Sequence, residues 1–437
     1  MANSRTMKKL AHVCLCNGLL LGCLLVSNAS WAAELSSVIR AAMESDPRVL
    51  AARSIYQSKL VEAEGAWSAY LPVLRGTGSA GSSQSSDPLV RDGSKKVYGL
   101  ELEQPIPLFG RESARVELAR VAARVEEAEV KRVEQAVVGE VLEAILGIGT
   151  AKETLVLRGA LADNLHDQVV AVRETVAGGG VKATEERLIQ SRAAQSDALR
   201  ARAAADLAAA SARLKRLMPE ATSVMRLEEH ELRRWWRGPL TLEAMEAAAM
   251  QTSLPLLKAQ AEAEQAGAEH AVARADLWPK LSVTLQKQAG TFGAASADSQ
   301  SLFLGISVPI YEGGSSVSRA DSAAHRLSAA RDKALQESRM TTQRIAEAWA
   351  RWRAAEAMAL AWRESERQEE EAVKLTGEQL AGGGATQVGL LRAKQTWLET
   401  LVQGADYRSQ RDVAWVRLMQ EAGSLTLPPA LPNNNDK

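Results

Sequence analysis

Cysteine is almost absent from this chain of 437 residues, which holds only Cys14, Cys16 and Cys23. All three lie within the first 32 residues, in a segment that has the features of an export signal. The mature chain that remains after removal of this segment has no thiol. A disulfide framework, thiol catalysis and thiolate metal sites are therefore excluded.

Residues 1–32 are expected to be a signal peptide. The stretch 13–26 is largely apolar, and Ser30 and Ala32 place small residues at the −3 and −1 positions of a cleavage site. A buried helix or a membrane anchor is the alternative, and the small-residue site disfavours both. Lipidation stays open, because the Leu-Leu-Gly that precedes Cys23 resembles a lipoprotein processing site. The basic residues at the start of the signal are Arg5, Lys8 and Lys9.

Aromatic residues and net charge are scarce as well. Aromatics make up 4% of the chain although 46% of it is hydrophobic, mostly as alanine, leucine and valine. This composition suits long, thinly packed helices rather than thick cores. The 53 basic residues balance the 53 acidic ones, and loss of the three basic signal residues leaves a small negative net charge. Nucleic acid is therefore not expected as a partner.

Long apolar runs and catalytic motifs are also missing. After the signal no run of about 18 apolar residues occurs, so a membrane would have to be crossed by strands rather than helices. The chain has no phosphate loop of the GxxxxGK[ST] type and no GxSxG elbow, and its histidines are scattered without metal-ligand spacing. We therefore expect neither an enzyme nor a cofactor or metal site.

Proline is absent from two long stretches, 108–218 and 310–427, and each stretch is broken once by the tetrapeptide Ala-Gly-Gly-Gly. Proline breaks helices, so its absence permits very long ones. Glycine supplies the backbone freedom with which a helix turns back. The breaks at 177–180 and 381–384 therefore predict the tips of two helical hairpins.

The chain reads as two copies of one unit. The first repeat is expected at 33–218 and the second at 241–427, with a connector at 219–240 and a disordered tail at 428–437. Each repeat opens with a helix (about 34–69 and 241–277), and each long helix (about 110–176 and 314–380) is followed after its tip by a shorter one (about 181–217 and 385–421).

Between the first and second helix of each repeat the pattern changes to a period of two, which is typical of strands. The predicted strands cover about 71–83, 97–107, 280–290 and 301–311. One face of each hairpin is apolar and the other is polar or small. That pattern fits a half-buried sheet of a soluble protein or the wall of a membrane barrel. Four strands are too few to close a barrel around water, so a barrel would need several chains.

The export signal, the two α-β-β-α repeats, the proline exits of the second strands and the glycine tips together resemble the TolC family of outer-membrane channel proteins. The resemblance implies a fold that is mainly α with membrane β. In this fold three chains form a homotrimer, each giving four strands to one twelve-stranded outer-membrane barrel. The long coiled-coil helices continue this barrel as a periplasmic tunnel.

The resemblance also implies a function and partners. Such proteins are exit ducts in the cell outer membrane that extend into the periplasm. They carry substrates for a tripartite efflux pump or a type I secretion system, together with a periplasmic adaptor protein and an inner-membrane pump or ABC transporter. The segments 180–182 and 188–192 are most similar to members that serve type I secretion. The cargo cannot be told from the sequence.

The resemblance assigns roles to single residues at the two tips and along the strands. Family members often carry aspartates after the second tip, where this chain has Gly389 and Arg392. The first tip keeps the acids Glu185 and Glu186, so an acidic ring and cation selectivity stay open. The expected aperture residues are Gly178, Gly179, Gly180, Glu185, Gly382, Gly383, Gly384, Gly389 and Arg392, the lumen residues Glu101 and Glu103, and the strand exits Pro107 and Pro309.

Two other classes of protein compete with the duct. A periplasmic coiled-coil adaptor or scaffold would use similar hairpins without membrane strands, and the alternating segments 98–106 and 302–310 disfavour it. A stand-alone outer-membrane pore would conduct freely without partners. The duct is the leading hypothesis.

Overall fold

The computed structural model describes residues 35–425 except for 36, 84–92, 179–181, 219–231, 233–239 and 293–294. The predicted signal with its cysteines, the tail at 428–437, and Gly179 and Gly180 of the first tip lie outside the described residues, as does nearly all of the connector. The chain divides into two units, and each is described by itself. The hairpin unit comprises Met1–Leu50, Val133–Ser253 and Met340–Lys437, and the sheet unit comprises Ala51–Arg132 and Leu254–Arg339.

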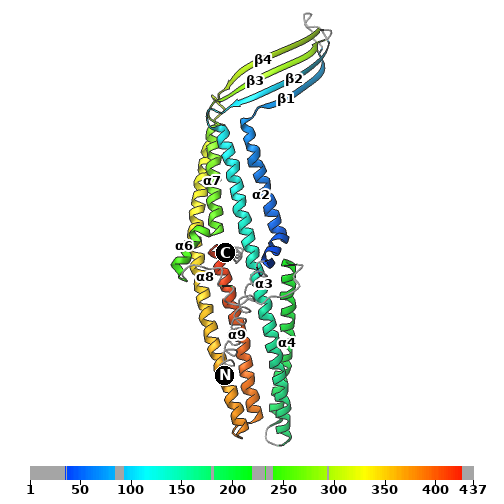
Figure 1. The fold of residues 1–437 in the computed structure, drawn as a ribbon, viewed down its shortest axis with the longest axis vertical. Helices are drawn as coiled ribbons and strands as arrows, with labels where there is room; N and C mark the ends of the chain where they lie inside the picture. The colour runs from blue at the N-terminus through cyan, green and yellow to red at the C-terminus, as the bar shows by residue number, and fades with distance from the viewer. Residues whose placement is uncertain are drawn as a thin grey trace, which may run out of the picture. The chain divides into compact units, whose positions relative to one another are not determined.

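The order of elements repeats itself along the chain (Figure 1). The first repeat holds α2 (Pro47–Gly65), the 3₁₀ helix η1 (Ala66–Tyr70), β1 (Val73–Ser83), β2 (Gly93–Ile106), α3 (Arg111–Ala177) and α4 (Ala183–Leu217). The second holds α6 (Leu242–Thr252), α7 (Leu254–Ala275), β3 (Lys280–Phe292), β4 (Ala295–Ser307), α8 (Ser315–Ala381) and α9 (Gln387–Glu421). This is the predicted mainly helical fold with two α-β-β-α repeats.

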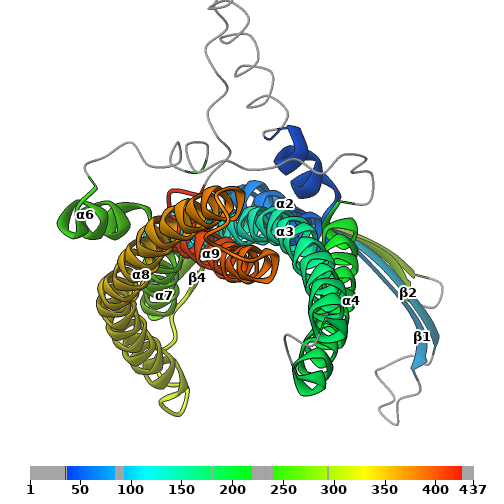
Figure 2. The same ribbon diagram turned by 90° about the horizontal axis from the view of Figure 1, so that it is seen from below.

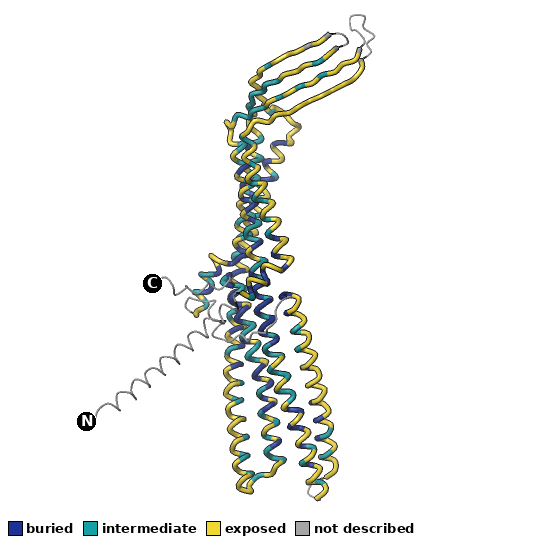
Figure 3. Tube along the Cα trace, turned by 45° about the vertical axis from the view of Figure 1, so that its right-hand side comes forward, coloured by how far each residue is buried: buried dark blue, intermediate teal, exposed yellow. Residues whose placement is uncertain are grey.

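The sheet unit carries one antiparallel sheet in the order β1-β2-β3-β4. The register sets Leu102 beside Leu285, and Leu285 beside Leu302, so that leucines of three strands share one face. The opposite face carries Glu101 beside Arg75 of β1 and Gln286 of β3. None of the strand residues whose burial is described is buried, and Figure 3 draws the strands in the colours of exposed and intermediate residues.

Three predicted elements differ in the structure. The helix predicted over 34–69 is interrupted at Asp46, because Pro47, where α2 begins, disfavours helical backbone just before it. The alternation of apolar residues continues through Val308 and Ile310, but β4 ends at Ser307. The reason is Pro309, which has no N–H to donate to a ladder. The helix predicted over 241–277 is interrupted at Ser253, where α6 ends and α7 begins. Pro255 explains the break, because its ring disfavours helical backbone just before it.

The core of the hairpin unit lies where its helices pack against the N-terminal segment, residues 35–49. Trp352 of α8 is 2% exposed and packs 5.1 Å from the ring of Trp415 on α9. The Trp415 indole N–H donates to the carbonyl of Leu232 at 2.9 Å, which satisfies its only polar group. Small and β-branched residues of α3 complete the packing: Val137, Val138, Val141, Ala144, Ile145 and Ile148.

Each long helix has a shorter partner in the hairpin unit. Figures 1 and 2 show α4 beside α3 and α9 beside α8. A second, smaller cluster of Leu161, Leu165, Ala193 and Leu398 joins α3, α4 and α9. Within the described residues, no helix is both long and apolar enough to cross a membrane.

An ionic network joins the two repeats inside the sheet unit. The Glu129 carboxylate on α3 accepts from Arg132 at 2.6 Å and from Lys258 of α7 at 2.9 Å. The hydrogen bonds from Arg132, followed by those from Lys258, lower the pKa of Glu129 from 4.5 to about 2. Because the folded state holds this carboxylate ionised, the network stabilises the folded state fully above about pH 4.5. That stabilisation is lost as the pH falls from 4.5 to about 2.

We therefore expect acid to weaken the sheet unit through this group. Glu129→Gln should lower the free energy of unfolding at pH 7 by about 1–2 kcal/mol, since Glu129 is only partly exposed. It should also flatten the dependence of stability on pH below 4.5. Thermal unfolding followed by circular dichroism between pH 3 and 7 measures both effects. Glu127→Gln, which changes an exposed pair with Lys131 on the same helix, is the control. An unchanged pH dependence in Glu129→Gln would contradict the expectation.

Candidate functional site

The tip of the second hairpin is built by glycine and a capping threonine. Among the predicted tip glycines that the structure describes, Gly383 adopts a positive φ of 77°, while Gly382 and Gly384 do not. After this turn, α9 begins with Thr386 as its N-cap, whose hydroxyl accepts from the backbone N–H of Gly389 at 3.0 Å. Gly389 thus lies in the first turn of α9. Its backbone N–H takes part in the N-cap, and the residue has no charged side chain.

The tip of the first hairpin is described at Gly178 and again from Lys182, the N-cap of α4. Glu185 and Glu186 lie in the first turn of α4, where the helix dipole favours negative charge. Glu186 accepts from Arg173 of α3 at 3.0 Å and so ties the two helices of this hairpin together.

The two tips are joined by an ion pair between the repeats. Nη2 of Arg392 on α9 lies 3.4 Å from Oε2 of Glu185 on α4. Both side chains are about half exposed, at 55% and 49%. An exposed pair of this kind contributes only about 0–1 kcal/mol, so a modest force can open it. Arg392 of the second hairpin therefore partly neutralises an acid of the first hairpin.

A buried amide lies one helical turn further from the tips. Gln168 of α3 is fully buried, and its Nε2 donates to Asn164 at 2.9 Å and to the carbonyl of Leu391 on α9 at 3.3 Å. Its third acceptor is Oε1 of Gln395, at 3.1 Å. The bonds to Leu391 and Gln395 join α3 to α9 near the tips, while the buried Oε1 of Gln168 has no partner among the described residues.

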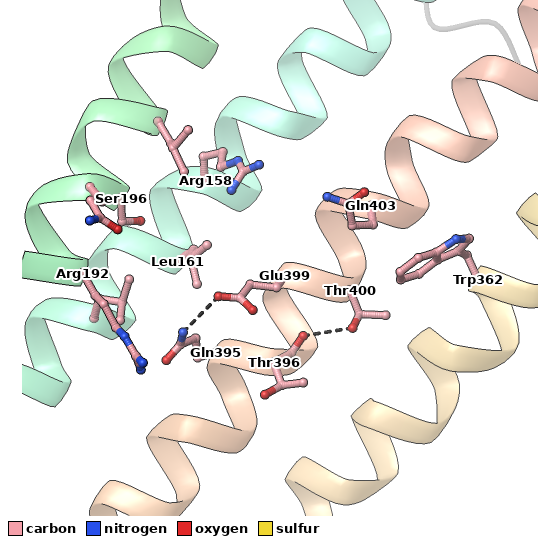
Figure 4. Close-up of a pocket in the computed structure, with 13 residues that line it drawn as sticks. Arg158, Leu161, Arg192, Ser196, Trp362, Gln395, Thr396, Glu399, Thr400 and Gln403 are labelled. Atoms are coloured by element: carbon pink, nitrogen blue, oxygen red, sulfur yellow. Dashed lines mark hydrogen bonds between the residues drawn. The ribbon is translucent and has the colours of Figure 1, made fainter. Parts of the chain in front are cut away.

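A groove of about 690 Å³ opens between the two hairpins (Figure 4). Arg158 and Arg192 line it from the first hairpin, and neither has a carboxylate partner among the described residues. Ser196 of α4 is 3% exposed, and its hydroxyl has no partner there either. The opposite wall comes from α8 and α9. It carries Trp362, Gln395, Thr396, Glu399, Thr400 and Gln403.

A second ionic contact joins the two hairpins. Arg408 of α9 donates to Glu366 of α8 at 2.5 Å and to Glu153 of α3 at 2.8 Å. Burial opposes the charged form of Arg408, but the hydrogen bonds and the charges of Glu366 and Glu153 together raise its pKa above the ordinary value. Gly404 lies one turn away, and a side chain there would overlap the Glu366 carboxylate. The absence of a side chain at Gly404 therefore leaves room for the Glu366 carboxylate that pairs with Arg408.

The predicted lumen and exit residues lie in the sheet unit. Glu101 and Glu103 share the polar face of β2, and Arg75 of β1 lies 3.5 Å from the first carboxylate and 2.9 Å from the second. Pro107 directly follows the end of β2, and Pro309 follows the end of β4 after one residue. Their lumen and exit roles stay predictions, and the sequence reasoning missed Arg75, which partly neutralises the two acids.

A comparison with protein families decides the identity. The model of the outer membrane efflux protein family matches residues 38–219 and 247–424, which cover both repeats. The chain belongs to this family. As an outer membrane efflux protein it is an exit duct of the outer membrane whose helical part extends into the periplasm. The family consists of channel proteins rather than enzymes.

Solved channel structures share the fold of this outer membrane efflux protein. CusC matches with a TM-score of 0.78 at 17% identity, covering 89% of this chain and 92% of CusC. VceC of Vibrio cholerae matches with 0.75 at 17% identity, covering 90% and 96%. MtrE of Neisseria gonorrhoeae, solved in its open state, matches with 0.70 at 20% identity, covering 89% and 88%. None of the curated proteins in the comparison matches the chain.

Proposed function

We propose that this outer membrane efflux protein works as a homotrimer whose four-stranded sheets close into one twelve-stranded barrel. One observation carries the proposal. Within the described residues, β1 and β4 each pair on one edge only, and none of their residues is buried. A sheet exposed on both faces with two long open edges is unstable alone in water. Pairing of β1 with β4 of the next copy satisfies both edges, and lipid covers the leucine face.

In this assembly the polar face lines the lumen and the hairpin tips form the periplasmic aperture. Glu101, Glu103 and Arg75 give each chain one surplus negative charge at that level of the lumen. At the tips, the exposed pair of Glu185 and Arg392 holds the two hairpins of a chain together, which keeps the aperture narrow. Separation of the pair lets the hairpins move apart and opens the duct.

The groove of Figure 4 is the proposed contact with the periplasmic adaptor. A helical hairpin of the adaptor fits such a groove by laying one face between two helices. The unpaired Arg158 and Arg192 favour an acidic residue on that face, and the unpaired hydroxyl of Ser196 offers a buried hydrogen bond. The adaptor in turn links the duct to an inner-membrane pump or ABC transporter, of an efflux or a type I secretion system.

Fractionation, mass and cysteine cross-linking test the assembly, and photo-crosslinking tests the contact. The purified protein should come from the outer-membrane fraction and have the mass of three chains, and cysteines on β1 and β4 should form covalent trimers only when both are present. A photo-crosslinking residue at Gln195 or Gln403 should capture the adaptor, whereas one at Ala201, on the far side of α4, should not. A monomer, or equal capture at Ala201, would contradict the respective part of the proposal.

A further inference from the structure

An aromatic cavity of about 680 Å³ lies in the sheet unit where three strands begin or end. Tyr70 precedes β1, Phe109 follows β2 and Trp278 precedes β3, so their rings mark one end of the sheet. Phe109 stacks on Trp278 with ring centroids 5.8 Å apart, and Trp67 lies 5.4 Å from Tyr70. The cavity therefore has two aromatic pairs as walls.

Two arginines bring uncompensated positive charge to this cavity. Arg120 of α3 lies over the ring of Trp67, 5.6 Å from its centroid, and Arg274 lies in the last turn of α7. Both are exposed, and neither has a carboxylate partner among the described residues. Side chains of a helix tilt toward its N-terminus, so Arg120 leans toward the sheet. The acid of the cavity, Glu117, is held by Arg124 at 3.3 Å.

An apolar row crosses the sheet at the same end as the cavity. Leu281 and Ile306 pair across β3 and β4 as the first apolar row, two residues or fewer from the strand ends. The next rows hold Leu304 and Leu302, each 70% exposed. The cavity can therefore bind the charged head of an amphipathic molecule, and the apolar rows of the sheet can contact its apolar tail.

We propose that this cavity binds the phosphate of a glycerophospholipid headgroup, with the acyl chains lying along the leucine face. This inference rests on the proposed function, in which the sheet crosses the outer membrane. Guanidinium groups bind phosphate oxygens with paired, charge-assisted hydrogen bonds. Tryptophan and tyrosine prefer the boundary between headgroups and hydrocarbon. Because no acid neutralises Arg120 and Arg274, a headgroup with net negative charge binds best.

Binding of phosphatidylglycerol to the purified, assembled protein tests the site. Native mass spectrometry of the protein with added lipid should show phosphatidylglycerol bound to the wild type. Binding should be at least about tenfold weaker in the double variant Arg120→Gln/Arg274→Gln, which removes both phosphate donors. Arg331→Gln, at an exposed position of α8 in the same unit that does not line the cavity, should bind as the wild type does.

Two further probes separate the lipid from other ligands without any variant. A diacylglycerol with the same acyl chains should bind at least about tenfold more weakly than the phospholipid, because it lacks the phosphate. Inorganic phosphate should not compete at lipid-saturating concentrations. Equal binding of diacylglycerol, equal binding by the double variant, or efficient competition by phosphate would each overturn the proposal. A wild type that is not a trimer of the outer membrane would instead overturn the proposed function.

Discussion

Export falls to the level of a strain that lacks the protein when the two hairpin tips of each chain are covalently joined. The change is a double variant, Glu185→Cys/Arg392→Cys, treated with a short thiol cross-linker. The native side chains meet at 3.4 Å across the two repeats, so the introduced thiols are within reach of such a linker. If the hairpins must separate for the aperture to open, a covalent link prevents this separation, whereas the weak exposed ion pair allows it.

The chain is well suited to this experiment. Residues 33–437 hold no native cysteine, so removal of the predicted signal would leave the introduced pair as the only thiols. Both positions are about half exposed, and loss of the ion pair costs only about 0–1 kcal/mol. Export of a pump substrate or secreted cargo is measured before the linker, with the linker, and after release with a cleavable form of it.

A second pair of positions controls for the linker itself. Arg173 and Glu186 also form an ion pair, at 3.0 Å, but both belong to the first hairpin. Cross-linking Arg173→Cys/Glu186→Cys therefore joins helices that need not separate, and export should continue. Export that persists through complete cross-linking of Glu185→Cys/Arg392→Cys would show that the tips are not the gate.

The sequence predicted the helical hairpins closely because their signals are local. The absence of proline and the two glycine breaks predicted helices that agree with α3, α4, α8 and α9 to within a few residues. Strand alternation predicted β2, β3 and β4 for the same reason, whereas β1, which is rich in glycine and serine and alternates only weakly, was predicted chiefly from the repeat. Alternation failed at Val308 and Ile310, where the apolar period continues but Pro309 ends the ladder. A pattern of side chains does not report whether the backbone can still donate hydrogen bonds.

The candidate site was only partly predictable. The aperture role of the tip residues stays a prediction, and the partner of Glu185 lies more than two hundred residues away in the chain. No local pattern assigns Arg392 to it, and the same holds for Arg408 with Glu153 and for Arg75 with Glu103. The groove was missed altogether, because its walls come from four helices. Ion pairs and cavities depend on how the two repeats pack against each other, and the hydrophobic periodicity of the sequence does not specify this packing.

The second large effect is expected at the C-terminal end of α9, where Gly423→Ala should lower the free energy of unfolding by about 2–5 kcal/mol. Gly423 has a φ of 66°, and the bond from Ser424 N–H to the carbonyl of Met419 closes the helix end around it. An added Cβ would overlap the backbone carbonyl of Thr252 and lie 2.9 Å from the nitrogen of Ser253. Backbone cannot rotate away as a side chain can, so α6 and α9 must move apart.

That separation would also break the hydrogen bond of 2.7 Å from the Thr252 hydroxyl to the carbonyl of Ala422. Gly383→Ala is the matched control, because its φ of 77° carries the same backbone strain while nothing lies within 4 Å of the added Cβ. It should cost about 1–2 kcal/mol. The comparison by chemical unfolding thus isolates the contact from the strain. Equal losses in both variants would mean that α6 does not press on the end of α9.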